Sequence, residues 1–352
     1  MSIKNLILKI NRIFFNRFIL HFKNTFVRMK LRYGGFFQTS KSLPKISIIR
    51  EFYSPPYGGG NQYMIYLVKE FRKMGFDVAI NSFSKKIKIL IIDYCWFNPK
   101  YESLIQKHKS KYGSKVIHRI DGLLTEYSTK KRLELDKLAM RINKISDLTI
   151  VQSNYSKSQF EDNNLKLSNT RIIYNSVDPS IFYPLGRKNL DTNKIIKIVS
   201  ASWSTNKNKG MDDYKWLDEN IHAKVSQKIE YSFVGRLDFS PKNINLISPK
   251  GQKRLSNIFQ NSDIFIFCSM KDPCPNVLLE AIACGLPVIF KNAGGPKELI
   301  KKFGLSYENI EELPELILEM INNYDYYQSE LDKHDFKNAP KNYAEEVLKL
   351  LK

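Results

Sequence analysis

The stretch that decides the fold lies at residues 263–300 and reads DIFIFCSMKDPCPNVLLEAIACGLPVIFKNAGGPKELI. Its first apolar run predicts a buried strand, and the loop that follows contains Pro273 and Pro275, two residues that interrupt regular structure. A helix is expected to begin at about Asn276 and to end at Gly285, because glycine suits the position just past a helix end. Strand, loop and helix together form one unit of a parallel α/β sheet.

The same unit recurs in both directions from this stretch. The predicted strands are 46–49, 76–80, 87–92, 116–120, 147–151 and 172–174 in the first half and 195–200, 229–234, 244–247, 264–267 and 288–290 in the second, with helices near 252–261, 276–284 and 296–303. A further helix carries the apolar stripe Met64, Leu67, Val68 and Phe71 and ends at Gly75. We therefore expect an α/β protein with two Rossmann-like doubly wound domains and an interdomain cleft where ligands bind.

A polar stretch without clear periodicity, residues 182–194, separates the two halves and is interpreted as a linker. The expected organisation is a basic amphipathic N-terminal segment at 1–44, a Rossmann-like domain at 45–185, a second Rossmann-like domain at 186–330 and a C-terminal helix at 331–352 that packs back on the N-terminal domain.

The composition indicates two folded cores. Of the 352 residues, 43% are apolar and 12% aromatic, which argues against a disordered or fibrous chain. No apolar run long enough to cross a bilayer is free of charge, so an integral membrane protein is not expected. The sequence shows no internal repeat at solenoid spacing, so a repeat array is not expected either. The cysteines show no paired or metal-binding spacing and indicate a reducing, cytosolic setting; they are Cys95, Cys268, Cys274 and Cys284.

The net charge of +21 favours phosphates, nucleic acid or anionic lipid as partners. Ten basic residues and no acidic residue lie within residues 1–45, so nearly half of the excess is at the N-terminus. Apolar residues there follow one helical face, with cations opposite, which is typical of a helix in the headgroup region of an anionic leaflet. We predict peripheral membrane attachment through residues 1–40. The alternatives are a helix that packs on the protein's own body and a transit or signal segment that is later removed.

The loop and helix of the deciding stretch also predict a binding site. The first N–H groups of a helix that begins at Asn276 form a ready anion site. Asp272 in the loop and Glu280 in the helix place two carboxylates beside it, and carboxylates accept hydrogen bonds from the hydroxyls of a sugar or ribose. Because its neighbours along the helix are apolar, Glu280 needs a partner.

One pattern within this stretch is long and specific. An acidic residue, seven further residues and a glutamate stand inside DPCPNVLLEAIACGLPVI, and Gly294, Gly295 and Glu298 follow. The pattern resembles the signature of the retaining glycosyltransferases of family 4 (group 1), which have the GT-B fold. The resemblance implies that the N-terminal domain takes the acceptor and that the C-terminal domain takes a nucleotide sugar.

The resemblance also assigns roles to single residues. In that family the first acid, here Asp272, approaches the hydroxyls of the donor sugar, and the second, here Glu280, binds the ribose. Backbone groups of the intervening loop, at Pro275, Asn276 and Val277, are expected to help hold the sugar. The first acid of the family is usually Glu, so Asp272 is one methylene shorter, and its reach to the sugar is expected to differ.

Cations for the leaving diphosphate are expected where a second-half strand ends. Lys209 and Gly210 match a Lys-Gly pair of the family, and positive charge there would meet the charge that develops on the leaving group. Family members carry an Arg a few residues earlier; here Lys207 is the nearest substitute, with a point charge in place of a bidentate group. Arg236 is another donor-binding candidate. For all three cations the competing interpretation is an ordinary surface residue of a lysine-rich protein.

In the first half, Gly58, Gly59 and Gly60 follow the first predicted strand and lead into a helix, as in the N-terminal domain of the family. Their backbone N–H groups are suited to a phosphate or an acceptor. Another strand ends where many family members place a His that contacts the donor sugar. That position falls on Asp121, whereas His118 is expected on the opposite face as a core histidine.

The expected enzyme moves a sugar from a nucleotide-sugar donor to a glycan, lipid-linked or cell-surface polysaccharide acceptor, and the resemblance supplies retention at the anomeric carbon. The expected catalytic residues are Asp121, Lys209, Asp272 and Glu280. No metal ion or other cofactor is expected, because lysine and helix amides can meet the charge of the leaving group. The expected location is cytoplasmic, with peripheral association with the membrane.

Two alternatives remain open. A non-catalytic nucleotide-sugar or glycan-binding protein of the same fold is compatible with the departures at Asp272, Lys207 and Asp121. A nucleic-acid-binding protein fits the net charge, but its expected interleaving of basic and aromatic residues is densest in the N-terminal segment. The motifs therefore favour the enzyme, with no nucleic acid as partner.

Overall fold

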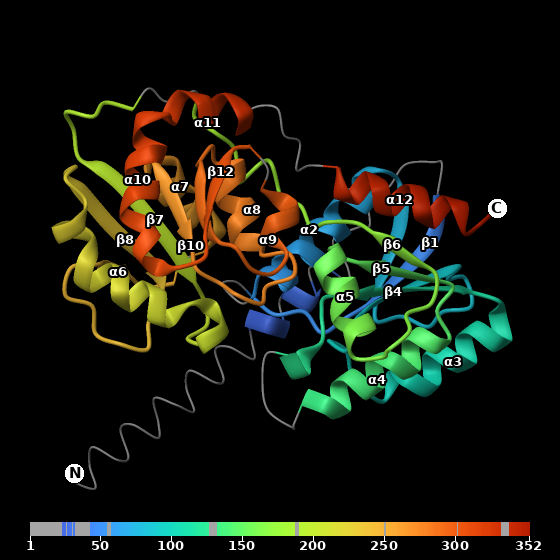
Figure 1. The fold of residues 1–352 in the computed structure, drawn as a ribbon. Coiled ribbons are helices and arrows are strands. Elements are labelled where there is room, and N and C mark those ends of the chain that lie inside the picture. The colour runs from blue at the N-terminus through green and yellow to red at the C-terminus, as the bar shows by residue number, and fades with distance from the viewer. Residues whose placement is uncertain are drawn as a thin grey trace, which may run out of the picture.

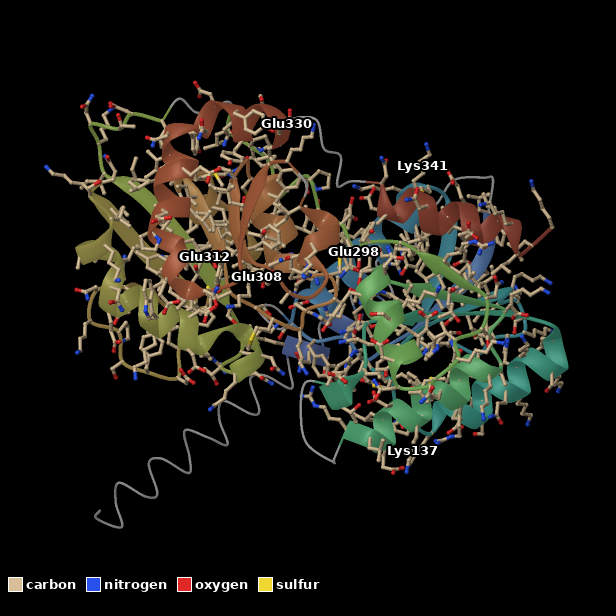
Figure 2. The ribbon with its side chains drawn as sticks, in the orientation of Figure 1. Lys137, Glu298, Glu308, Glu312, Glu330 and Lys341 are labelled. Atoms are coloured by element: carbon tan, nitrogen blue, oxygen red, sulfur yellow. The ribbon has the colours of Figure 1, made fainter. Side chains whose placement is uncertain are left out.

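The computed structural model describes residues 23–25, 27–29, 31, 43–54, 58–126, 132–186, 190–249, 251–300, 302–331 and 338–352. Two lobes lie side by side, and each contains a six-stranded parallel sheet with helices packed on it (Figure 1). Side chains fill the space between sheets and helices in both lobes (Figure 2). The predicted α/β class with two doubly wound domains is therefore confirmed.

The first sheet has the order β2-β1-β3-β4-β5-β6, and all neighbouring strands are parallel. Its strands are β1 (Leu43–Ile49), β2 (Phe76–Ile80), β3 (Ile89–Asp93), β4 (Lys115–Ile120), β5 (Leu148–Val151) and β6 (Thr170–Ile172). Successive side chains of a strand point to opposite faces. Thus Ile46 and Ile48 join one buried cluster and Ile49 joins another. Because both faces are covered, the central strands have nearly continuous apolar sequences.

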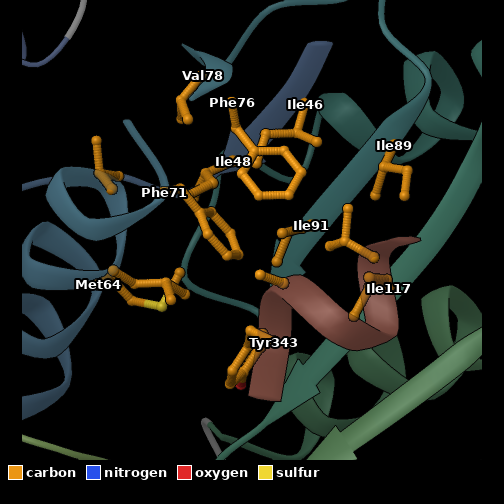
Figure 3. Close-up of a cluster of buried hydrophobic side chains, with 14 of the residues drawn as sticks. Ile46, Ile48, Met64, Phe71, Phe76, Val78, Ile89, Ile91, Ile117 and Tyr343 are labelled. Atoms are coloured by element: carbon orange, nitrogen blue, oxygen red, sulfur yellow. The ribbon is translucent and has the colours of Figure 1, made fainter. Parts of the chain in front are cut away.

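Helices α2 (Gly59–Lys73) and α12 (Ala339–Lys349) cover one face of this sheet, and α3 (Tyr101–Tyr112) and α4 (Leu133–Lys144) cover the other. Under α2, Met64 and Phe71 pack with Phe76 and Ile91 (Figure 3). Burying an apolar side chain of this size stabilises the fold by about 1.5–3 kcal/mol. Helix α5 (Asn154–Asp162) follows β5.

The second sheet has the order β12-β11-β10-β7-β8-β9 and is also parallel throughout. Its strands are β7 (Ile196–Ser202), β8 (Ile229–Gly235), β9 (Asn245–Ile247), β10 (Ile264–Phe267), β11 (Val288–Lys291) and β12 (Gly304–Tyr307). In β10, Ile264 and Ile266 face one cluster while Phe265 and Phe267 face the other. Both faces of this sheet are therefore buried as well.

Helices α6 (Met211–Lys224), α10 (Leu313–Asn322) and α11 (Tyr324–Leu331) pack on one face of the second sheet. Helices α7 (Gln252–Gln260), α8 (Asn276–Ala283) and the short α9 (Pro296–Leu299) pack on the other. The loops that begin α8 and α6 stand at the carboxyl ends of the strands, where the candidate site lies.

The last helix, α12, crosses back to the first lobe. Ala339, Tyr343 and Val347 belong to the same buried cluster as β1 and α2 (Figure 3). In Figure 1 this red helix lies beside the blue and green elements, apart from α10 and α11. The boundaries predicted at residues 45, 186 and 331 stay predictions, since no measurement separates the domains as independent units.

The predicted strands all correspond to observed strands, with shifted ends. Among the strands of the described residues, β12 is the one that the sequence analysis did not predict. Its run GLSY has a single fully buried side chain, Tyr307, and so carries no apolar pattern.

Most of the N-terminal segment, including residues 1–22 and 32–42, lies outside the described residues, and so does most of the predicted membrane helix. The described helical residues between 23 and 31 contact the first lobe: Asn24 Oδ1 accepts hydrogen bonds from Ser54, and Arg28 forms a 2.8 Å ion pair with Glu51. For this part of the segment, the contacts favour packing on the protein's own body. Within the described ranges, no helix has the length and apolar character needed to span a bilayer.

Candidate functional site

A cavity of about 400 Å³ lies between the two lobes. Its walls follow the carboxyl ends of strands in both sheets, with Gly58 after β1, Asp121 after β4, Trp203 after β7 and Asp272 after β10. Ligands of doubly wound folds bind at this edge of the sheet. The volume is within the range of about 300–1,000 Å³ that is typical of small-molecule sites.

Most of the predicted site residues line this cavity: Gly58, Gly59, Gly60, Asp121, Lys209, Asp272, Pro275, Asn276, Val277 and Glu280. Lys207 and Arg236 are not among the lining residues. Lys207 is exposed in a short 3-10 helix whose last residue, Lys209, reaches the cavity. Arg236 is also exposed, and its guanidinium lies 4.6 Å from the ring centre of Trp203. Trp203 itself lines the cavity.

Lys209 and Asp272 form an ion pair inside the cavity. Gly210, directly after Lys209, has a φ of +79°, and a Cβ there would lie 2.2 Å from the carbonyl oxygen of Cys268. Glycine therefore lets this loop lie directly against the end of β10. The close approach brings Lys209 to Asp272 although the two residues are far apart in the sequence.

Glu280 is buried on α8 with 7% of its surface exposed. Burial raises the pKa of Glu280 to about 8, and a hydrogen bond with Gln252 opposes this shift. A carboxyl group that is neutral near pH 7 can donate one hydrogen bond and still accept others. Since Glu280 lines the cavity, it is suited to the paired hydroxyls of a ribose.

Two helices begin at the cavity, α2 from the first lobe and α8 from the second. Their first residues are in contact, since a Cβ on Gly59 would lie 2.7 Å from the Cβ of Asn276. No described side chain caps either helix start. The unpaired N–H groups and the positive ends of both helix dipoles therefore favour an anion between the lobes. In the part of the chain that the structure describes, no group of three or more His, Cys, Asp or Glu is placed to hold a metal ion.

Asp121 stands after β4, and 27% of its side chain is exposed. Its Oδ1 accepts hydrogen bonds from Arg119 Nη1 (2.6 Å) and from Gln152 Nε2, and its Oδ2 accepts one from Trp96 Nε1 (3.0 Å). Burial alone would raise the pKa of Asp121, but the guanidinium groups of Arg119 and Arg50 lower it below its ordinary value. Asp121 is therefore a fixed anion at the cavity wall.

A buried charge cluster lies beneath Asp121, and the sequence analysis missed it. Asp93 forms ion pairs with both Arg50 and Arg119, and all three residues are buried. A signal for two of them existed, because Arg50 and Asp93 are charged residues directly after apolar strand runs. Arg119 gave no such signal, since it stands inside a strand.

His118 is fully buried, as expected for a core histidine. Its Nε2 donates a 3.1 Å hydrogen bond to the carbonyl oxygen of Tyr94, and burial lowers the pKa of His118 to about 4. The ring is therefore neutral and takes no part in the cavity wall.

The two lobes are held together at Glu298, which lies at their boundary (Figure 2). Glu298 comes from α9 of the second lobe, and its carboxylate accepts hydrogen bonds from the backbone N–H groups of Asn154 (2.7 Å) and Tyr155 (2.6 Å) in the first turn of α5. Nearby, Lys271 forms a 2.9 Å ion pair with Glu126. Both contacts join the second lobe to the first.

The comparisons with known proteins agree with this geometry. The family model of glycosyl transferases group 1 matches residues 218–342. An uncharacterized glycosyltransferase of Methanocaldococcus jannaschii is 27% identical over 274 residues, which cover 73% of this chain and 73% of that protein.

Solved structures extend the likeness to both lobes. Sucrose-phosphate synthase of Thermosynechococcus elongatus has a TM-score of 0.68 at 15% identity, over 88% of this chain and 99% of that chain. Anabaena HepE in complex with UDP and glucose has a TM-score of 0.65 at 16% identity, over 87% and 100% of the two chains. These likenesses confirm the predicted GT-B fold. The family match itself is confined to residues 218–342.

Proposed function

We propose that the protein is a retaining glycosyltransferase of family 4 that moves a sugar from a nucleotide donor to a glycan, lipid-linked or cell-surface polysaccharide acceptor. The observation that carries the proposal is that Lys209, Asp272 and Glu280 meet at one cavity between two GT-B lobes. The sequence pattern around Asp272 and Glu280 supports retention. UDP-glucose is the first donor to test, since the Anabaena neighbour was solved with UDP and glucose.

In this proposal the donor lies along the second lobe. The nucleobase packs against apolar side chains of the lining, such as Trp203, Val234 and Leu255. The ribose hydroxyls meet Glu280. The diphosphate lies at the first N–H groups of α8 and beside Lys209, where a cation and a helix start stabilise negative charge. The donor sugar then lies toward the glycine loop of the first lobe, between Asp272 and Asp121.

The proposed reaction occurs on one face of the sugar. The bond between the anomeric carbon and the diphosphate oxygen breaks, and both electrons leave with the diphosphate. The acceptor hydroxyl oxygen forms the new bond from the same side, and its proton passes to the departing phosphate oxygen. Lys209 contributes most where the charge of the leaving group is largest, in the transition state. No metal ion is required in this scheme, because Lys209 and the two helix starts supply the positive charge.

The acceptor and the location are part of the proposal. The first 45 residues hold ten cations and no acidic residue, which suits a cytoplasmic enzyme that attaches peripherally to an anionic membrane and takes a lipid-linked acceptor. Asn24 and Arg28 contact the first lobe, so this role is assigned to the other residues of the segment.

The test is a panel of nucleotide sugars, scored by thermal stabilisation and by release of the nucleotide diphosphate. We expect one donor to stabilise the protein and to be turned over, with the anomeric configuration kept in the product by NMR. Glu280→Ala should lose the stabilisation. Equal stabilisation of parent and variant by every donor would contradict the site, and stabilisation without turnover with any acceptor would favour the binding-protein alternative.

A further inference from the structure

Two carboxylates border the part of the cavity where the lobes meet, one from each lobe. Gly122 and Pro273 are in contact across the boundary, since a Cβ on Gly122 would lie 2.9 Å from Pro273 Cγ. Asp121 precedes the first of these residues and Asp272 precedes the second, so the two acids flank the same interlobe contact. Both line the cavity.

The hydrogen bonds that Asp121 already accepts leave its carboxylate few free acceptor positions. An ionised carboxylate has about four acceptor positions. Among the described residues, three donors occupy it, namely Arg119 and Gln152 on Oδ1 and Trp96 on Oδ2. One position on Oδ2 remains, and the side chain is 27% exposed. Asp121 can therefore accept a single further hydrogen bond from a group in the cavity, such as one sugar hydroxyl.

The surroundings of Asp121 do not favour a second anion. Lys209 is the one basic side chain among the described residues that line the cavity, and it already pairs with Asp272. Arg119 and Arg50, which lie behind Asp121, are balanced by Asp93 and Asp121 themselves. In the proposed scheme the starts of α2 and α8 already meet the charge of the diphosphate. A carboxylate on the sugar would therefore face two acids with no basic side chain left for it, at a site where water screens charges poorly.

We propose that Asp121, with Asp272 opposite, determines the class of donor sugar: the site takes uncharged sugars that donate a hydroxyl hydrogen bond to Asp121 Oδ2, and it excludes uronic acids. This inference rests on the proposed function and goes beyond it by naming the sugar class. Asp121 acts directly on the sugar, and Arg119, Gln152 and Trp96 position its carboxylate.

The first experiment uses the unmodified protein and donor pairs that differ only in the carboxylate: UDP-glucose and UDP-glucuronate, UDP-galactose and UDP-galacturonate, GDP-mannose and GDP-mannuronate. Dissociation constants and kcat/KM for donor hydrolysis are measured for each. For the preferred pair, we expect the dissociation constant of the uronate to be at least about tenfold higher than that of the neutral sugar and its kcat/KM to be at least about tenfold lower. Equal or better use of that uronate would overturn the inference while leaving the proposed function in place. Failure of all six donors to bind would overturn the donor site, and the inference with it.

The second experiment tests Asp121 itself. Asp121→Asn removes the charge and offers an amide N–H to a sugar carboxylate, so the ratio between neutral and uronate donors should fall toward one. Asp147→Asn is the matched control. Asp147 pairs with Lys109 at the opposite end of the strands, and its substitution changes the net charge of the protein by the same amount. A folded Asp121→Asn protein with unchanged discrimination would refute the role of Asp121. Should this variant not fold, the donor pairs with the unmodified protein still decide the sugar class.

Discussion

The carboxylate of Glu298 accepts a 2.6 Å hydrogen bond from the backbone N–H of Tyr155, so a side chain of the second lobe caps a helix of the first. The phenol of Tyr174, also from the first lobe, donates a further 3.1 Å hydrogen bond to this carboxylate. Helix starts carry unpaired N–H groups and partial positive charge, which an anion stabilises. The N-terminus of α5 thus helps to fix how the lobes meet.

Replacing Glu298 by Gln should loosen this contact, because the amide has a similar size but no charge and only one acceptor oxygen. We expect a loss of about 1 kcal/mol of unfolding free energy and a larger radius of gyration by small-angle X-ray scattering without donor. Glu311→Gln is the control, since Glu311 is exposed in the second lobe. Scattering curves that match for the parent and Glu298→Gln would show that the contact does not hold the lobes together.

Gly59→Ala should weaken donor binding, because the new Cβ would lie 2.7 Å from the Cβ of Asn276 in the other lobe. Either the lobes separate or the start of α8 shifts, and both displace the N–H groups proposed for the diphosphate. We expect about a tenfold higher dissociation constant by calorimetry, equivalent to about 1.4 kcal/mol. Gly60→Ala is a close control, since a Cβ there meets no atom within 4 Å. Similar affinities of the two variants would argue against a tight contact between the lobes.

The stability of the protein should depend on pH through Glu280. Burial raises the pKa of Glu280 to about 8, so the folded state holds a proton that the unfolded state releases near the ordinary value of 4.5. The unfolding free energy should therefore fall as the pH rises from about 4.5 to about 8. In Glu280→Gln this contribution is absent, so its melting temperature should fall less over that range. If the melting temperatures of parent and variant changed by the same amount from pH 5 to pH 8.5, a protonated Glu280 would be contradicted.

Removal of divalent cations should leave the transfer reaction intact. In the proposed scheme Lys209 and the starts of α2 and α8 meet the charge of the leaving group. We expect turnover in excess EDTA to match turnover with added Mg²⁺ within about twofold, whereas Lys209→Gln should lower kcat by about 100-fold, as loss of one charge-stabilising group does elsewhere. A complete loss of activity in EDTA that Mg²⁺ restores would require a different scheme.

The strand and helix pattern and the acidic pair could be predicted from the sequence because each depends on neighbouring residues. Asp272 and Glu280 are linked by one loop and one helix, so their positions follow from local structure. The pairing of Lys209 with Asp272 could not be predicted, because it depends on which strands of the second sheet are neighbours. The same holds for Arg236, which reaches Trp203 because β7 and β8 pair in a register that places Gly235 opposite Ser202.

The sites that sequence reasoning missed are contacts between distant segments. Asp93 meets Arg119 from the next strand of the sheet, and Glu298 meets α5 from the other lobe. Charged side chains of this kind look like ordinary surface residues until the fold encloses them. The burial of the Asp93 cluster and the contact of Glu298 with α5 are both properties of the assembled structure alone.

The return of α12 to the first lobe has a consequence for how the chain folds during its synthesis. The second lobe, from β7 to α11, is one uninterrupted stretch and can fold as soon as it leaves the ribosome. The first lobe begins earlier but finishes later, because Tyr343 and Val347 belong to its buried cluster. A nascent chain that stops before residue 339 would leave the apolar side chains beside β1 and α2 open to water and to chaperones.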